Sequence, residues 1–173
     1  MKEILILNPE NATEEEVKNY SRRDAARGVV VDDQNKLALL HVSKGKYYKL
    51  PGGGLEGDED KFTAFRRECA EEIGSDVEIS VELGIVVEYR KIFQLKQTSY
   101  CYLAKVKSEK GTPDFTDEEK ANGFEVAWVS YADALQLLNE SRDTAANLEG
   151  REYIVPRDIA ILKAAEPRLP LVM

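Results

Sequence analysis

The chain has 173 residues, of which 43% are hydrophobic and 32% are charged, as expected for a globular protein with one core. Its formal net charge of −8 argues against a nucleic acid polymer as a partner, because binding a phosphate backbone requires clustered Lys and Arg. The acidic N-terminus does not resemble a signal peptide, and no segment approaches the roughly 20 apolar residues of a membrane span. We therefore expect a cytoplasmic protein with no membrane partner, in which Cys69 and Cys101 are buried, reduced thiols.

The first segment, residues 1–22, is predicted to be an extension that precedes a main domain of residues 23–173. Its apolar run Ile4–Leu7 predicts a short strand. The sequence Thr13–Glu16 has the form of a capping box and predicts a short helix that ends near Tyr20. Two roles remain open for this extension, which are a contact in a homodimer and the covering of a sheet edge.

The main domain alternates between strand and helix patterns. Strands are predicted at Gly28–Val31, Lys36–Val42, Tyr47–Leu50, Val77–Phe93, Gln97–Lys107 and Phe124–Val129. Helices are predicted at Asp60–Ile73, Tyr131–Asn139 and Pro156–Ala165, and a polar loop at Ser108–Asn122. Strands on both sides of a central helix, with further helices at the end of the chain, predict an α/β fold in which a mixed sheet is covered on two faces.

The helix predicted at Asp60–Ile73 carries an acidic flank. Glu68, Glu71 and Glu72 are spaced i, i+3 and i+4, so they lie within about 100° of one another beside the apolar stripe. Like charges at this spacing cost about 0.2–0.5 kcal/mol per pair, a cost that a hard cation would offset. The ordinary alternative is a solvated helix face in which Arg67 pairs with Glu71.

The residues directly before this helix favour a binding site over a solvated face. Pro51–Gly54 is a glycine-rich turn, and glycines let a backbone approach a ligand closely. Asp60 is well placed as the N-cap of the helix. A divalent metal held here would reverse the local negative charge, so a small phosphorylated molecule is compatible with the net charge.

The whole segment resembles the signature of the Nudix hydrolases. The matching array is Gly53, five residues, Glu59, seven residues, Arg67-Glu68-Cys69, one residue, Glu71-Glu72, one residue, Gly74-Ser75. Ser75 departs from the pattern, in which a bulky aliphatic residue is usual, and Val77 is expected to compensate in the core. The resemblance implies an α/β/α sandwich with a mixed sheet and the family's loop–helix–loop, spanning about residues 24–165.

The resemblance also implies an activity. The expected enzyme is a metal-dependent hydrolase that cleaves the diphosphate linkage of a nucleoside diphosphate joined to another group, with Mg²⁺ or Mn²⁺ as the cofactor. The implied metal ligands are Glu68, Glu71, Glu72 and the backbone carbonyl of Gly53. Glu59 and Arg67 are expected to orient the helix carboxylates as part of the catalytic site. The general base stays open among Glu68, Glu72 and a loop carboxylate.

Substrate recognition is less constrained by the sequence. Gly53, Gly54, Arg27 and Lys49 are the residues expected to bind substrate phosphates. Glu118 and Glu119 lie in the polar loop, Glu125 follows it, and all three are either surface residues or additional site carboxylates. A nucleoside triphosphate, a nucleotide sugar and a dinucleoside polyphosphate all remain open as the small nucleotide substrate. The alternative function is a ligand-sensing module that keeps the fold without turnover, although such proteins usually lack some of the glutamates that are present here.

Overall fold

The computed structural model describes residues 1–173 and contains one mixed sheet. The strands are β1 (Glu3–Leu7), β2 (Ser21–Val31), β3 (Leu37–Val42), β4 (Tyr47–Lys49), β5 (Gly52–Gly54), β6 (Val77–Arg90), β7 (Leu95–Val106) and β8 (Phe124–Val129). Their order is β1-β6-β7-β2-β3-β4, with β5 paired to β2 and β8 paired to β3. The pairs β1–β6 and β2–β7 are parallel, whereas β6 and β7 are antiparallel, so the sheet is mixed as predicted.

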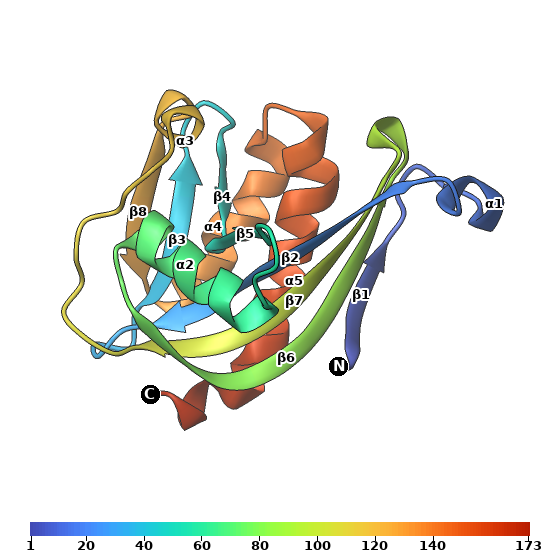
Figure 1. Ribbon diagram of the computed structural model, residues 1–173. Coiled ribbons are helices and arrows are strands. Elements are labelled where there is room, and N and C mark those ends of the chain that lie inside the picture. The colour runs from blue at the N-terminus through green and yellow to red at the C-terminus, as the bar shows by residue number, and fades with distance from the viewer.

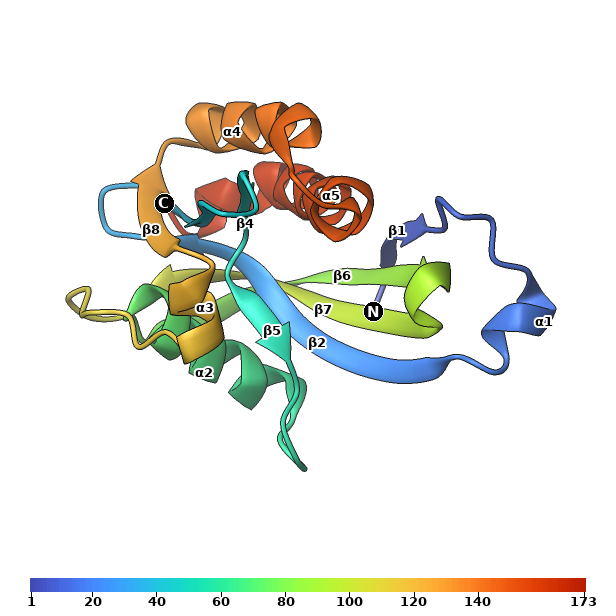
Figure 2. The same cartoon turned by 90° about the horizontal axis from the view of Figure 1, so that it is seen from above.

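The helices cover both faces of this sheet (Figures 1 and 2). The α-helices are α1 (Glu14–Val17), α2 (Lys61–Ile73), α3 (Asp117–Ala121), α4 (Tyr131–Thr144) and α5 (Val155–Ala165). Figure 2 shows α4 and α5 on one side of the sheet and α2 and α3 on the other. Two 3₁₀ turns, Lys91–Phe93 and Glu166–Leu171, and a π-helical turn, Gly150–Ile154, complete the regular structure. The predicted α/β/α arrangement is confirmed, and no helix has the length and apolarity needed to cross a bilayer.

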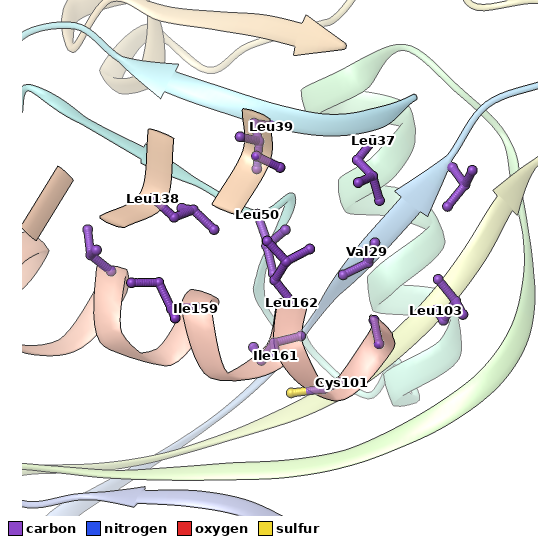
Figure 3. Close-up of a cluster of buried hydrophobic side chains, with 14 of the residues drawn as sticks. Val29, Leu37, Leu39, Leu50, Cys101, Leu103, Leu138, Ile159, Ile161 and Leu162 are labelled. Carbon is purple, nitrogen blue, oxygen red and sulfur yellow. The ribbon is translucent and has the colours of Figure 1, made fainter. Parts of the chain in front are cut away.

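Two hydrophobic clusters hold the layers together, because alternate residues of each strand point to opposite faces. On β2, Val29 and Val31 belong to the cluster under α4 and α5, whereas Ala26 and Val30 belong to the cluster under α2. Figure 3 shows the first cluster, in which Leu162 of α5 lies among strand residues. The central strands are therefore buried on both sides where these apolar residues lie.

Several elements differ from the sequence prediction. The segment Ser108–Asn122 was expected to be a loop, but it contains α3, because Thr116 forms a capping box with Glu119. The glycine turn is also partly extended, since Gly52–Gly54 pairs with β2 as the short strand β5.

Some boundaries moved as well. Strand β2 begins at Ser21 instead of Gly28, because its polar first half pairs with β7 along the whole length of the strand. Helix α4 extends to Thr144 instead of Asn139, and α1 ends at Val17, earlier than the predicted Tyr20.

The N-terminal residues are attached to the body of the fold. Strand β1 pairs with β6 in parallel and lies at the edge of the sheet, and it confirms the short strand predicted there. The phenolic hydroxyl of Tyr153 donates a hydrogen bond to the Glu10 carboxylate, which joins the segment after β1 to the turn before α5. The extension thus covers the edge of β6.

Candidate active site

Helix α2 is fixed at both ends. The Asp60 carboxylate accepts hydrogen bonds from the backbone N–H groups of Phe62 and Thr63, both at 2.9 Å, so the predicted N-cap is confirmed. Gly74 ends the helix in the left-handed conformation, with φ of 63°. Ser75 is buried and donates its hydroxyl to the Ile73 carbonyl, while Val77 is in the core as expected.

Arg67 connects the flank of α2 to the residues before it. Its guanidinium forms a two-pronged pair with Glu59, with an Nη2–Oε1 distance of 2.6 Å and an Nε–Oε2 distance of 3.2 Å. It also donates to Glu68 at 3.0 Å, to Glu71 at 3.2 Å and to the Gly54 carbonyl at 3.0 Å. The hydrogen bond from Arg67 lowers the pKa of Glu59. One arginine thus holds three carboxylates and the glycine strand in a single arrangement.

Glu72 is the most enclosed carboxylate of this group, with 3% of its surface exposed. Its Oε2 accepts a hydrogen bond from the Gly52 backbone N–H at 2.7 Å, and its Oε1 pairs with the Lys49 ammonium at 2.9 Å. Lys49 also donates to the Gly52 carbonyl at 3.3 Å. Burial raises the pKa of Glu72, and the positive charge of Lys49 opposes this effect.

Glu68 lies directly against β5. A Cβ placed on Gly53 would collide with its Oε1, so only glycine leaves room for the carboxylate here. Burial, followed by repulsion from Glu72, raises the pKa of Glu68 to about 7. Two carboxylates that repel each other beside a backbone strand form an oxygen-donor set of the type that Mg²⁺ and Mn²⁺ prefer. The chemistry of the donors therefore fits a divalent cation.

The third helix glutamate has a different position. The Glu71 side chain is 38% exposed and turns toward Arg67. No group of three His, Cys, Asp or Glu side chains converges closely enough to hold an ion in the present arrangement. Lys49 and Arg67 supply the countercharges of the helix carboxylates instead.

A cavity of about 510 Å³ opens beside these carboxylates, and this volume suits a small-molecule ligand. One end is acidic and is lined by Glu68 and Glu72 of α2 and by Glu118 and Glu119 around α3. The other end is basic. Its lining includes Arg23, Arg27, Arg90, Gln97 and Arg157.

Comparison with known proteins identifies the family. The model of the NUDIX domain matches residues 21–148, which is most of the chain. This chain belongs to the Nudix family. It is therefore a hydrolase of the class that acts on phosphoric anhydrides, and such enzymes act on small nucleotide-type substrates and generally require divalent metal ions.

Solved structures share the fold at low sequence identity. A NUDIX hydrolase from Nitrosomonas europaea has a TM-score of 0.59 at 18% identity, over 86% of this chain and 88% of the other. An Ap4A hydrolase from C. elegans also has a TM-score of 0.59, at 16% identity over 86% and 98% of the chains. An ADP-ribose pyrophosphatase from Streptococcus suis has 0.53 at 16% identity, over 84% and 92%. No curated protein matches the sequence.

The basic end of this Nudix hydrolase was not predicted as a unit. Glu88 of β6 is fully buried and accepts hydrogen bonds from Arg90 at 2.8 Å and from Gln97 at 2.8 Å. Arg157 of α5 lies 3.5 Å from Glu88 and 2.7 Å from Asp158. Charged residues at alternate inward positions of a long apolar strand, Glu88 and Arg90, were the available signal in the sequence.

Asp158 links this cluster to the glycine strand. Its carboxylate accepts a hydrogen bond from the Leu50 backbone N–H at 2.7 Å, and it is fully buried. Leu50 stands two residues before β5, so α5 fixes the start of the segment on which Glu68 and Glu72 rest. Asp158 is therefore a structural support for the site.

Most aromatic side chains of the strands lie away from the cavity. Tyr48 stacks on His41 at a centroid distance of 4.5 Å, and Trp128 lies under the Lys110 ammonium at 4.3 Å. Phe124 is the one aromatic residue in the lining, and the Lys49 ammonium lies 5.2 Å from its ring centroid.

Proposed function

We propose that this Nudix hydrolase cleaves the diphosphate linkage of a nucleoside diphosphate joined to another group. The observation that carries the proposal is the position of Glu68 and Glu72, two repelling carboxylates that face one cavity beside β5. The proposed cofactor is Mg²⁺ or Mn²⁺, held by Glu68, Glu71, Glu72 and the Gly53 carbonyl. When bound, such an ion neutralises phosphate charge and lowers the pKa of a bound water.

The neighbouring residues have supporting roles in this proposal. Arg67 and Glu59 keep the carboxylates in place through the two-pronged ion pair. Lys49 is positioned to exchange its Glu72 partner for a substrate phosphate when a cation takes over the carboxylate. Gly53 and Gly54 have no side chains, so phosphates can approach their backbone closely.

The general base is proposed to be Glu68, Glu72 or Glu119. Glu119 lies in α3, within the segment that was predicted to be a loop, and it is favoured there because its Oε2 is buried without a hydrogen-bond partner while the residue lines the acidic end of the cavity. An unpartnered buried oxygen costs free energy unless a ligand, ion or water satisfies it. Glu125 does not line the cavity.

The cellular setting and assembly are also part of the proposal. Cys69 and Cys101 are free and buried, which supports a reducing compartment such as the cytoplasm. We propose that residues 1–22 form an extension of a domain that consists of residues 23–173. A homodimer contact through this extension stays a prediction.

The proposal is tested by Glu72→Gln, with Glu78→Gln as the matched control, since Glu78 is an exposed glutamate of β6 outside the cavity. We expect Glu72→Gln to lower turnover of a nucleotide panel at least about 100-fold, because it removes a charged metal ligand. The amide keeps the shape of the side chain, so melting should stay close to wild type. Chelator should abolish wild-type activity, and Mg²⁺ or Mn²⁺ should restore it.

A second measurement distinguishes an enzyme from a ligand-sensing module that has no turnover. Titration with Mn²⁺ should show weaker metal binding in Glu72→Gln than in wild type or Glu78→Gln. Near-normal hydrolysis by Glu72→Gln, or activity that resists chelator, would contradict the metal-site assignment. Nucleotide binding without any turnover by wild type would favour the ligand-sensing alternative.

A further inference from the structure

Arg27 is a buried cation without an anionic partner. Only 3% of its surface is exposed, and its one hydrogen bond within the protein runs from Nε to the Ser99 hydroxyl at 3.0 Å. No carboxylate lies within ion-pair distance of it, and its side chain lines the cavity. A charge removed from water without a counter-charge is costly, so a group of opposite charge is the expected partner.

The carboxylates nearby, Glu88 and Asp158, act on Arg27 only from beyond ion-pair distance, because their short contacts are to other arginines. Arg90 and Arg157 already share Glu88, and Arg157 also pairs with Asp158. Arg23 adds a further positive charge, and its Nη1 donates to Gln97, a neutral side chain, at 2.7 Å. Burial and then repulsion by Arg157 lower the pKa of Arg27 to about 10, so it remains charged at neutral pH.

The basic end lies immediately across β5 from the helix carboxylates. A Cβ on Gly53 would strike the Glu68 carboxylate, and a Cβ on Gly54 would lie 2.8 Å from Arg23 Nη2, whereas a Cβ on Gly52 would strike the backbone and Cβ of Arg27. Consecutive Cα atoms are about 3.8 Å apart. Glu68, Arg27 and Arg23 all line the same cavity beside this strand, which carries no side chains, so a short phosphate chain in the cavity can reach from the carboxylate to the arginines.

The same end offers little for a neutral group. Leu55, Phe124 and Ile154 are the only hydrophobic residues in the lining of the whole cavity. Arginine forks match the oxygens of phosphate, whereas a neutral sugar or base would leave Arg27 uncompensated.

We propose that Arg27 and Arg23 bind a third phosphate beyond the diphosphate that is cut, so that the substrate is a nucleoside triphosphate or a dinucleoside polyphosphate and not a nucleotide sugar. This rests on the proposed function, in which the scissile diphosphate lies at Glu68 and Glu72. The third phosphate supplies the anion that the buried network lacks.

The test compares substrates with the same base and different phosphate numbers. ATP and diadenosine tetraphosphate carry a third phosphate, whereas ADP-ribose and ADP-glucose do not. We expect wild type to have a higher kcat/KM for the first pair. In Arg23→Gln and Arg27→Lys, this preference should fall at least about 10-fold, because the first change removes a charged donor and the second removes the guanidinium fork that matches phosphate oxygens. Arg22→Gln, a change at the exposed neighbour of Arg23 outside the cavity, should keep the wild-type preference.

Binding is measured separately from turnover by calorimetric titration of the Mg²⁺-loaded protein with inorganic triphosphate and inorganic diphosphate. Triphosphate should bind more tightly, and Arg23→Gln should remove this difference even if a change at Arg27 prevents folding. Equal or better hydrolysis of ADP-glucose by wild type, or an unchanged preference in Arg23→Gln, overturns the inference while the proposed hydrolase function stands. Arginine-dependent triphosphate binding without hydrolysis of any compound retains the phosphate site and refutes the proposed function.

Discussion

Two charged clusters flank β5, and they are built in opposite ways. On the side of α2, the carboxylates Glu59, Glu68 and Glu71 share Arg67 as their cation, and their side chains are 12–38% exposed. On the side of α5, the arginines exceed the buried carboxylates, and Glu88 and Arg157 are at most 2% exposed. The first cluster has an excess of negative charge near a cavity, and the second has an excess of positive charge in the interior.

This difference indicates which charged side chains can exchange one ion-pair partner for another. Near α2, Lys49 and Arg67 are side chains that a divalent cation can replace as partners, because the carboxylates border the cavity. Near α5, Glu88 is enclosed by arginines and a glutamine from three elements, so it has no route to another partner. The first cluster is suited to chemistry, whereas the second stabilises the fold and leaves Arg27, which has no ion pair, in the lining of the cavity.

The largest expected effect is on the enclosed cluster. Glu88→Gln should lower the free energy of unfolding by about 3–5 kcal/mol, because it leaves Arg90 and Arg157 buried without their shared counter-charge. Chemical denaturation measures this change. Glu82→Gln, on the same strand but outside the cluster, is the control and should have little effect.

The ion pairs of Glu88 also predict how the stability of the protein depends on pH. Burial acts to raise the pKa of Glu88, but Arg157, Arg90 and Arg27 outweigh it and hold the pKa below the ordinary value of 4.5. A depressed pKa contributes stability above pH 4.5, and this contribution is lost as the pH falls toward the folded-state pKa. Wild type should therefore lose stability below about pH 4.5 more steeply than Glu88→Gln. Parallel curves for the two proteins would contradict the charge network.

A smaller effect is expected at the boundary between the clusters. Gly53→Ala should lower kcat/KM about 10- to 100-fold, because the new Cβ would displace the Glu68 carboxylate. If this is the cause, the substitution should add almost nothing to the loss already produced by Glu68→Gln. Full additivity of the two changes in a double-mutant cycle would show that Gly53 acts by another route.

The smallest expected effect concerns α3, which brings Glu119 to the acidic end. Thr116→Ala removes the cap of this helix and should cost about 1 kcal/mol of local stability. Amide hydrogen exchange of residues 117–122 should accelerate about fivefold. Thr112→Ala, at an uncapped and exposed position, should leave it unchanged. Equal exchange in both variants would mean that packing, and not the cap, holds α3.

Local patterns were enough to predict the helix and its cap. The cap at Asp60 and the apolar stripe of α2 depend on residues that are close together in the sequence, and the structure confirms both. The strands of the central sheet were also found, because β-branched and apolar residues persist along them. The helix α3 was missed although its capping box is in the sequence, since a polar segment with Gly111 and Pro113 suggests a loop.

The sequence by itself determined the glycine-and-glutamate array, because its members are separated by at most 21 positions and one helix fixes the relative angles of Glu68, Glu71 and Glu72. Only the tertiary structure decided that Glu88 and Arg157 form an ion pair with Arg27 nearby, since these residues come from β6, α5 and β2. Their approach depends on the parallel pairing of β2 with β7 and on the packing of α5 over the sheet. Contacts between segments that are distant in the sequence depend on how the whole core packs. The spacing of residues within one segment does not specify that packing.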